Sequence, residues 1–248
     1  MSLGEHLLEL RRRLFISGVA LVVAAVMGWL LTEFVWDQLR EPISRIAEAR
    51  NATINYPGIT DAFDIRLQLA VTIGLVIASP VWLYQIFAFL VPGLTSKEKR
   101  YTFGFFFSAV PLFLGGCAAG WFVLPHIVEL MASFVPAEDA SIVSARIYFD
   151  FVLKLVIATG VAFVLPVFLV ILNFLGVMSA KSILKGWRVA ILVITLFTAI
   201  VTPAADVLSM FLLAIPMVGL YFAAAGVAYL HDRRAAARNQ RVEESLAT

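Results

Sequence analysis

Six runs of apolar residues constrain the fold of this chain more than any other feature. A helix needs about 20 apolar residues to cross a hydrocarbon core roughly 30 Å thick. The strands of a membrane barrel would instead show about 10 residues of alternating polarity, whereas these runs are apolar all round. The sequence therefore predicts an all-α, polytopic membrane protein with six transmembrane helices. The predicted spans are 14–31, 67–91, 101–124, 151–177, 187–201 and 207–230.

The composition supports the same class of protein. The chain is 61% hydrophobic and 15% charged, whereas a soluble domain is roughly 45–50% apolar and about 25% charged. A net charge of +2 gives no reason to expect a nucleic-acid partner. The single cysteine, Cys117, excludes an intramolecular disulfide and a metal site built on cysteines.

The basic residues predict the orientation of the chain in the membrane. Arginines and lysines beside a span tend to stay in the cytoplasm. With six spans, 13 of the 19 basic residues fall on the side that holds both termini, so both termini are expected inside. Residues 1–230 are expected to form one transmembrane domain, followed by a disordered cytoplasmic tail, 231–248. The 13 residues are Arg11, Arg12, Arg13, Lys97, Lys99, Arg100, Lys181, Lys185, Arg188, Arg233, Arg234, Arg238 and Arg241.

Prolines and short segments predict bent helices that enclose a concave surface. Pro80 lies inside the second span, and Pro92-Gly93 ends it. The outer loop 32–66, which includes Pro42, is expected to carry short helices that cap the outer face. The fifth span, 187–201, would be only about 22 Å long at 1.5 Å per residue, so the bilayer is expected to thin there or the residues after it to lie deep.

The predicted spans contain no Lys, Arg, Asp or Glu apart from Lys154 at an outer edge and Arg188 at an inner edge. Ion-coupled transporters usually hold ionisable residues near the midplane. The spans also lack the residue sets of hydrolytic enzymes. The sequence therefore favours a binding scaffold with neither a cofactor nor catalytic activity, and a six-helix small-solute or ion transporter is the alternative.

Three polar residues near the inner face are candidates for binding, and each has a structural alternative. Glu98 could accept a cationic ligand, but with Thr95 it also fits a helix capping box. Glu9 could do the same, but Glu9 and Arg13 have the i,i+4 spacing of an intrahelical ion pair. His6 could titrate near neutral pH or be a passive polar residue at the interface.

Three stretches carry a resemblance to a known family. Residues 5–14, Glu-His-Leu-Leu-Glu-Leu-Arg-Arg-Arg-Leu, resemble the N-terminal signature of the TatC family, the multi-span receptor subunit of the twin-arginine protein translocase. Residues 84–100 are similar to its first cytoplasmic loop, with Tyr84-Gln85, Phe87, Phe89, Pro92-Gly93-Leu94 and Glu98-Lys99-Arg100. Thr202-Pro203, Asp206 and Pro216 are similar to its last outer turn and sixth helix.

The resemblance implies a receptor for the paired arginines of signal peptides, in which Glu98 and Glu9 accept the two guanidinium groups. Arginine makes forked, charge-assisted bonds to carboxylates that lysine cannot reproduce. The resemblance also implies that single-span partner subunits pack against the fifth and sixth helices. The implied signal-peptide residues are Glu98, Glu9, Arg11, Arg13, His6, Lys99, Arg100 and Phe89, the partner contacts are Thr202, Pro203 and Asp206, and the structural residues are Pro42, Pro80, Pro92 and Gly93.

Further expectations follow from the same resemblance. They are a location in the bacterial cytoplasmic membrane, contact with membrane lipid, further copies of the chain in a larger complex, export of folded precursors and transport driven by the proton-motive force. One position departs from the family, whose members commonly carry a glutamate before the fourth-helix proline. Here the run is Phe163-Val164-Leu165-Pro166, so the role of that acid must be filled otherwise or to a lesser degree.

Overall fold

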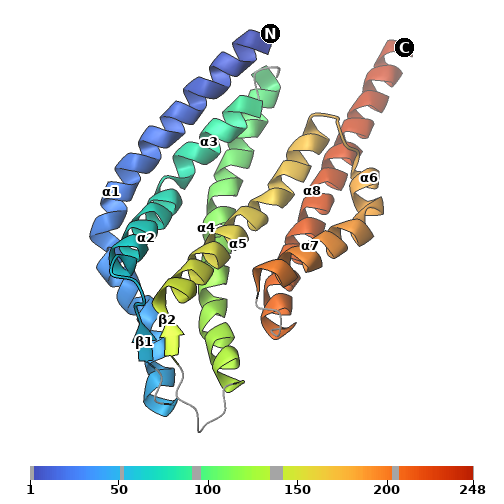
Figure 1. The fold of residues 1–248 in the computed structure, drawn as a ribbon. Helices are drawn as coiled ribbons and strands as arrows, with labels where there is room; N and C mark the ends of the chain where they lie inside the picture. Colours follow the sequence, from blue (N-terminus) through green and yellow to red (C-terminus); the bar gives the residue numbers. More distant parts are fainter. Residues whose placement is uncertain (1–2, 51–52, 91–95, 135–141, 203–206, 248) are drawn as a thin grey trace.

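The computed structural model describes residues 3–50, 53–90, 96–134, 142–202 and 207–247, and almost all of them are helical (Figure 1). The all-α fold class is therefore confirmed. In chain order the elements are α1 (Leu3–Arg50), β1 (Thr53–Asn55), α2 (Asp61–Ile77), α3 (Ser79–Leu90), α4 (Ser96–Ser133), β2 (Ile142–Ser144), α5 (Ala145–Phe174), α6 (Ala180–Lys185), α7 (Trp187–Val201) and α8 (Val207–Ala247).

Both ends of the described chain lie at one end of the molecule. Figure 1 shows the start of α1 and the end of α8 at the top, and β1 and β2 near the bottom. We call these the termini end and the strand end. The two strands pair in parallel, with Thr53 opposite Ile142. Both strands lie in the connections between the predicted spans, so they do not conflict with the prediction that the spans themselves are helical.

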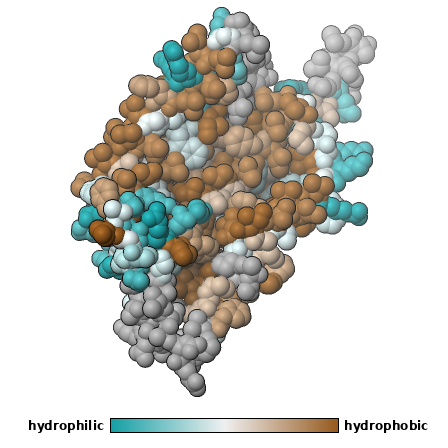
Figure 2. All heavy atoms as spheres, in the orientation of Figure 1, coloured by the Kyte–Doolittle hydropathy of each residue, from teal (hydrophilic) through white to brown (hydrophobic). Residues whose placement is uncertain are grey.

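The apolar helices correspond to the six predicted segments. Four helices of the described chain, α1, α4, α5 and α8, are long and apolar enough to cross a membrane. The helices α2 and α3 meet this criterion together, as a pair bent by 58°. The sixth apolar helix is α7, whose bounds Trp187–Val201 match the predicted fifth segment. Figure 2 shows a broad hydrophobic surface between hydrophilic groups at the edges of the molecule.

The helix α1 is far longer than the predicted span 14–31. It continues without a break to Arg50, so the expectation of separate short helices after residue 31 is wrong for this part of the loop. The reason is that the apolar stripe continues beyond the span: Val35, Trp36 and Leu39 pack into the main core. This burial holds the stretch helical through Pro42, whose side chain lies outside the described residues.

The second predicted span is broken at Ala78, two residues before Pro80. Proline has no N–H to donate, and its ring disfavours helical geometry in the residue before it. The break is stabilised by Trp82, whose indole Nε1–H donates to the carbonyl of Leu75 at 2.9 Å. Pro80, for which a structural role was expected, thus lies in the first turn of α3, directly after the bend.

The predicted disordered tail, 231–248, is helical to Ala247 as a continuation of α8. The prediction of disorder was wrong because the stretch is rich in Ala, Arg and Glu, which are strong helix formers, and holds neither Gly nor Pro. Its first residues are also anchored. The carboxylate of Asp232 accepts from the Ala180 N–H at 2.8 Å and from Asn173 Nδ2 at 2.9 Å, and the His231 ring stacks on Phe174.

The helices α4 and α5 cross at a surface of small residues. A methyl group added at Gly116 would lie 2.6 Å from the Thr159 carbonyl oxygen and 2.8 Å from the Gly160 Cα atom. Backbones can approach this closely only where side chains are absent, as is common between membrane helices. The Thr159 hydroxyl is buried and bonds to its own helix, through the carbonyls of Leu155 and Val156.

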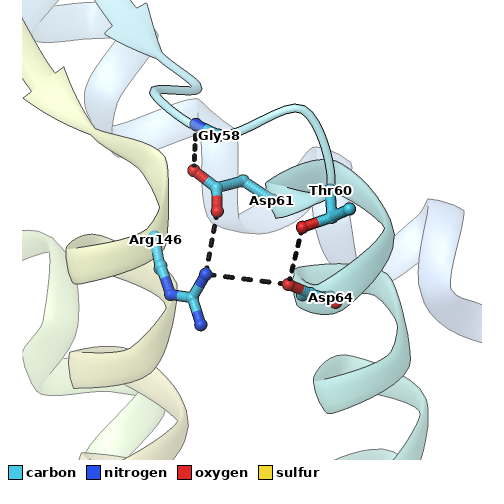
Figure 3. Close-up of polar contacts among 5 residues, drawn as sticks. All are labelled: Gly58, Thr60, Asp61, Asp64 and Arg146. Carbon is cyan, nitrogen blue, oxygen red and sulfur yellow. Dashed lines mark hydrogen bonds and ion pairs between the residues drawn. The ribbon is translucent and has the colours of Figure 1, made fainter.

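A polar cluster at the strand end joins α2 to α5 (Figure 3). Arg146 Nη1 donates to Asp61 Oδ1 at 2.9 Å and lies 3.6 Å from Asp64 Oδ2. The Gly58 N–H donates to Asp61 Oδ2 at 2.7 Å, and Thr60 donates to Asp64. The hydrogen bond from Gly58, and then that from Arg146, hold the pKa of the Asp61 carboxyl below its ordinary value, against the opposing effect of burial.

We predict that Gly116→Ala destabilises the protein, because the added methyl group would collide with the backbone of α5. Such overpacking costs about 1–3 kcal/mol, and thermal unfolding in detergent measures it. Gly115→Ala is the matched control, since a methyl group at Gly115 meets nothing within 4 Å. Equal melting temperatures for the two variants would show that α4 and α5 do not cross this closely.

We also predict that Asp61→Asn lowers the melting temperature at neutral pH and that this difference shrinks in acid. The Asp61 pKa is lower in the folded than in the unfolded protein, where it is about 3.9. Its stabilisation is therefore complete above that value and is lost as the pH falls through the folded pKa. Melting curves between pH 7 and pH 3 test this, with Asp64→Asn as control. A difference that stays constant with pH would contradict it.

Candidate functional site

Two helices present polar residues to each other at the termini end. On α1, His6, Glu9 and Arg13 are spaced by three and four residues and so share one helix face. On α3, Gln85 and Phe89 are also four residues apart. We call these five residues the α1–α3 site. The site lies at the end of the molecule where the sequence predicted the inner face.

The centre of the site is an ion pair that continues into a contact between the helices. Arg13 Nη2 lies 2.5 Å and Arg13 Nε 3.2 Å from Glu9 Oε1, so the predicted i,i+4 pair is confirmed. Arg13 Nη1 donates across to Gln85 Oε1 at 3.2 Å. The side chains of Glu9 and Arg13 are 25% and 21% exposed, so the pair remains reachable from solvent.

Two further features make the site suitable for binding. The His6 ring stacks on Phe89 with centroids 4.4 Å apart, which joins the ends of α1 and α3 through an aromatic contact. Beside the ion pair is an open hollow of about 450 Å³. Its lining combines acidic, basic, amide and apolar side chains: Leu8, Glu9, Arg12, Arg13, Ile16 and Gln85.

The chemistry of the site suits a cationic group that arrives with an apolar segment. Both described hydrogen bonds to Glu9 end on Oε1, which leaves Oε2 available as an acceptor. Because Arg13 already balances the charge of Glu9, the pair alone is neutral. A ligand with two positive charges therefore needs a second carboxylate close by.

The remaining predicted signal-peptide residues are not part of the described contact between α1 and α3. Arg11 is exposed on α1 and is not part of the contact with α3. Glu98, Lys99 and Arg100 belong to the first turns of α4, but their side chains lie outside the described residues, as does Thr95.

The predicted partner-contact and turn residues are only partly described. Thr202 ends α7 with its side chain buried, and its hydroxyl donates to the Thr198 carbonyl at 2.8 Å. Pro203 and Asp206 lie outside the described residues, and so do Pro92 and Gly93.

Sequence reasoning did not select Gln85 or Arg12 as site residues. Gln85 stands in one of the recognised motifs, but its contact with Arg13 joins residues 72 positions apart. Helical spacing along one segment cannot reveal such a contact. Arg12 was counted only as a topological signal, although it lines the hollow.

The interior of the described chain lacks the charges that ion transport would use. Its buried polar side chains are hydroxyls and one amide, and the single buried charged residue, Asp61, belongs to the strand-end cluster. No group of three His, Cys, Asp or Glu residues that could hold a metal occurs in the described part of the chain. Val164, at the position where the family resemblance implies an acid, is 3% exposed in the main core.

The fold and the α1–α3 site define a multi-pass helical membrane protein with an open polar hollow at one end. The family described as Sec-independent protein translocase protein (TatC) matches residues 5–216. The chain therefore belongs to the TatC family, as the sequence motifs predicted. It is accordingly a multi-pass component of a protein translocase of the bacterial inner membrane, and not an enzyme.

The similarity to known proteins extends over nearly the whole chain. The Sec-independent protein translocase protein TatC of Xylanimonas cellulosilytica is 46% identical over 95% of this chain and 86% of its own length. TatCy of Bacillus subtilis is 34% identical over 89% of this chain and 86% of its own length. A crystal structure of a twin-arginine translocase receptor, TatC in DDM, superposes with a TM-score of 0.77 at 31% identity, covering 90% of this chain and 99% of the other.

Proposed function

We propose that this chain is the signal-peptide receptor of a twin-arginine translocase, with the termini end in the cytoplasm and the α1–α3 site in contact with the signal peptide. The observation that carries the proposal is Glu9. It is held at the edge of an open hollow by Arg13, which also donates to Gln85, and one of the Glu9 carboxylate oxygens remains available. The similarity to solved twin-arginine translocase receptors supports the same assignment.

Recognition of two arginines requires two carboxylates. In this proposal Glu9 accepts one guanidinium and Glu98, on the first turn of α4, accepts the other. Arginine is preferred over lysine because its planar fork places two N–H groups on one carboxylate. Lys99, Arg100 and Arg11 set the local charge, and His6 with Phe89 offers an aromatic surface to the apolar part of the signal.

Partner subunits are proposed to pack against α7 and α8. The helix α7 has a row of exposed apolar side chains, Val189, Leu192, Val193, Leu196 and Ile200. Such a row suits the packing of a single-span helix within the membrane. Thr202, Pro203 and Asp206 would stand at the end of this surface, and further copies of the chain would complete the translocase complex.

Binding of a twin-arginine signal peptide to the detergent-purified chain tests the receptor proposal. We expect the arginine peptide to bind more tightly than its twin-lysine variant. Glu98→Gln and Glu9→Gln should each weaken arginine-peptide binding by about tenfold or more, because losing one partner of a hydrogen-bonded charge pair costs about 2–5 kcal/mol.

Glu33→Gln is the matched control, since Glu33 also pairs with an arginine, Arg66, but at the strand end. This variant should bind the peptide as the unaltered chain does. A preference for arginine that survives both Glu9→Gln and Glu98→Gln would overturn the proposal. In that case Glu98 is a helix cap and recognition lies elsewhere.

A further inference from the structure

A second hollow lies between α1 and α2, near the strand end. Its volume is about 450 Å³. We call it the α1–α2 hollow, and it is lined by Thr32, Glu33, Trp36, Asp37, Arg40, Ala62 and Arg66. The signal-peptide proposal uses none of these residues, and the inference below depends only on the chain spanning a membrane.

The position of the hollow along the sequence places it at the membrane surface. Thr32 and Glu33 follow directly on the apolar run 14–31, and Arg66 directly precedes the apolar run 67–91. Polar lining residues on both helices therefore begin where the hydrocarbon core ends. Tryptophan is enriched at this depth, and Trp29 and Trp36 both lie beside the hollow's arginines.

The two arginines of the hollow are fixed in place. The Arg66 guanidinium lies over the Trp29 ring at 4.8 Å, and it donates to Thr32 Oγ1 at 3.2 Å and to Glu33 Oε1 at 3.1 Å. The Arg40 guanidinium lies 5.4 Å from the Trp36 ring and donates to the Tyr56 hydroxyl at 3.1 Å. Each guanidinium group has more N–H donors than these hydrogen bonds use. Two guanidinium groups held in this way could donate hydrogen bonds to one phosphate.

Two carboxylates complete the lining. Glu33 and Asp37 are one helical turn apart on α1, and both are exposed. Together with Arg40 and Arg66 they give the hollow no net charge. An anionic ligand alone would leave the acids unpaired, whereas a ligand with a phosphate and an amine would satisfy both pairs.

We infer that the α1–α2 hollow binds the headgroup of a zwitterionic phospholipid with a primary amine, that is, a phosphoethanolamine headgroup. Arg40 and Arg66 hold its phosphate, and Glu33 and Asp37 accept hydrogen bonds from its ammonium group. A primary ammonium fits better than a quaternary one, because the tryptophan rings that would attract a quaternary amine already carry arginines. Exposed apolar side chains suited to contact with the acyl chains lie close in sequence to the lining residues: Leu30, Phe34, Phe63 and Leu67.

Native mass spectrometry of the detergent-purified full chain tests this inference. The probes are phosphatidylethanolamine and phosphatidylglycerol with identical acyl chains. We expect one phosphatidylethanolamine molecule to bind more tightly than phosphatidylglycerol. The double variant Arg40→Gln/Arg66→Gln should weaken that binding by about tenfold, because charge-assisted hydrogen bonds are lost. Glu33→Gln/Asp37→Asn should instead remove the preference between the two lipids.

Arg188→Gln is the matched control, because Arg188 also lies over a tryptophan, Trp187, at 5.5 Å, but outside the hollow. Arg40→Gln alone, at an exposed position, keeps the test valid if the double variant fails to fold, which its melting temperature without lipid reports. Unchanged binding in Arg40→Gln, or equal affinity of the unaltered chain for both lipids, would overturn the inference. So would displacement of the lipid by an equal concentration of glycerophosphoethanolamine, which has no acyl chains.

Discussion

The hydrocarbon core of the bilayer admits neither unpaired backbone groups nor uncompensated charges, and the arrangement of this chain follows from that constraint. The described backbone within the predicted spans is helical except in the turn 175–177 after α5 and at the bend between α2 and α3, where Trp82 satisfies the Leu75 carbonyl. With no charge buried in the described middle of the bundle, the helices associate through close packing. The crossing of α4 and α5 at Gly116 and Gly160 is the clearest example.

Charged groups are therefore gathered at the two ends, and they have different tasks there. At the strand end Asp61 and Arg146 join α2 to α5, and this cluster fixes the relative position of the helices. At the termini end Glu9 and Arg13 are partly exposed beside a hollow, an arrangement that favours exchange with a ligand. The strand-end cluster thus joins two helices, whereas the termini end keeps an open hollow beside a charged pair.

Much of this organisation could be predicted from the sequence, because apolar runs and helical spacing are local signals. The bounds of α7 and the ion pair of Glu9 with Arg13 are examples. The extension of α1 to Arg50 could not be predicted in this way, because burial of Leu39 against distant helices overrides the tendency of Pro42 to break a helix. Nor could the contact of Arg146 with Asp61, which joins residues 85 positions apart and depends on how the helices pack.

The central claim is that the hollow beside Glu9 receives the twin-arginine signal peptide, and photocrosslinking tests it most directly. A photoreactive phenylalanine analogue would replace Leu8, an exposed residue that lines this hollow, or Asp37 at the strand end, in inverted membrane vesicles that receive a twin-arginine precursor. The account predicts crosslinks from position 8 that disappear with a twin-lysine precursor, and none from position 37. Crosslinks from position 37 alone, or crosslinks from position 8 that persist with the twin-lysine precursor, would contradict it.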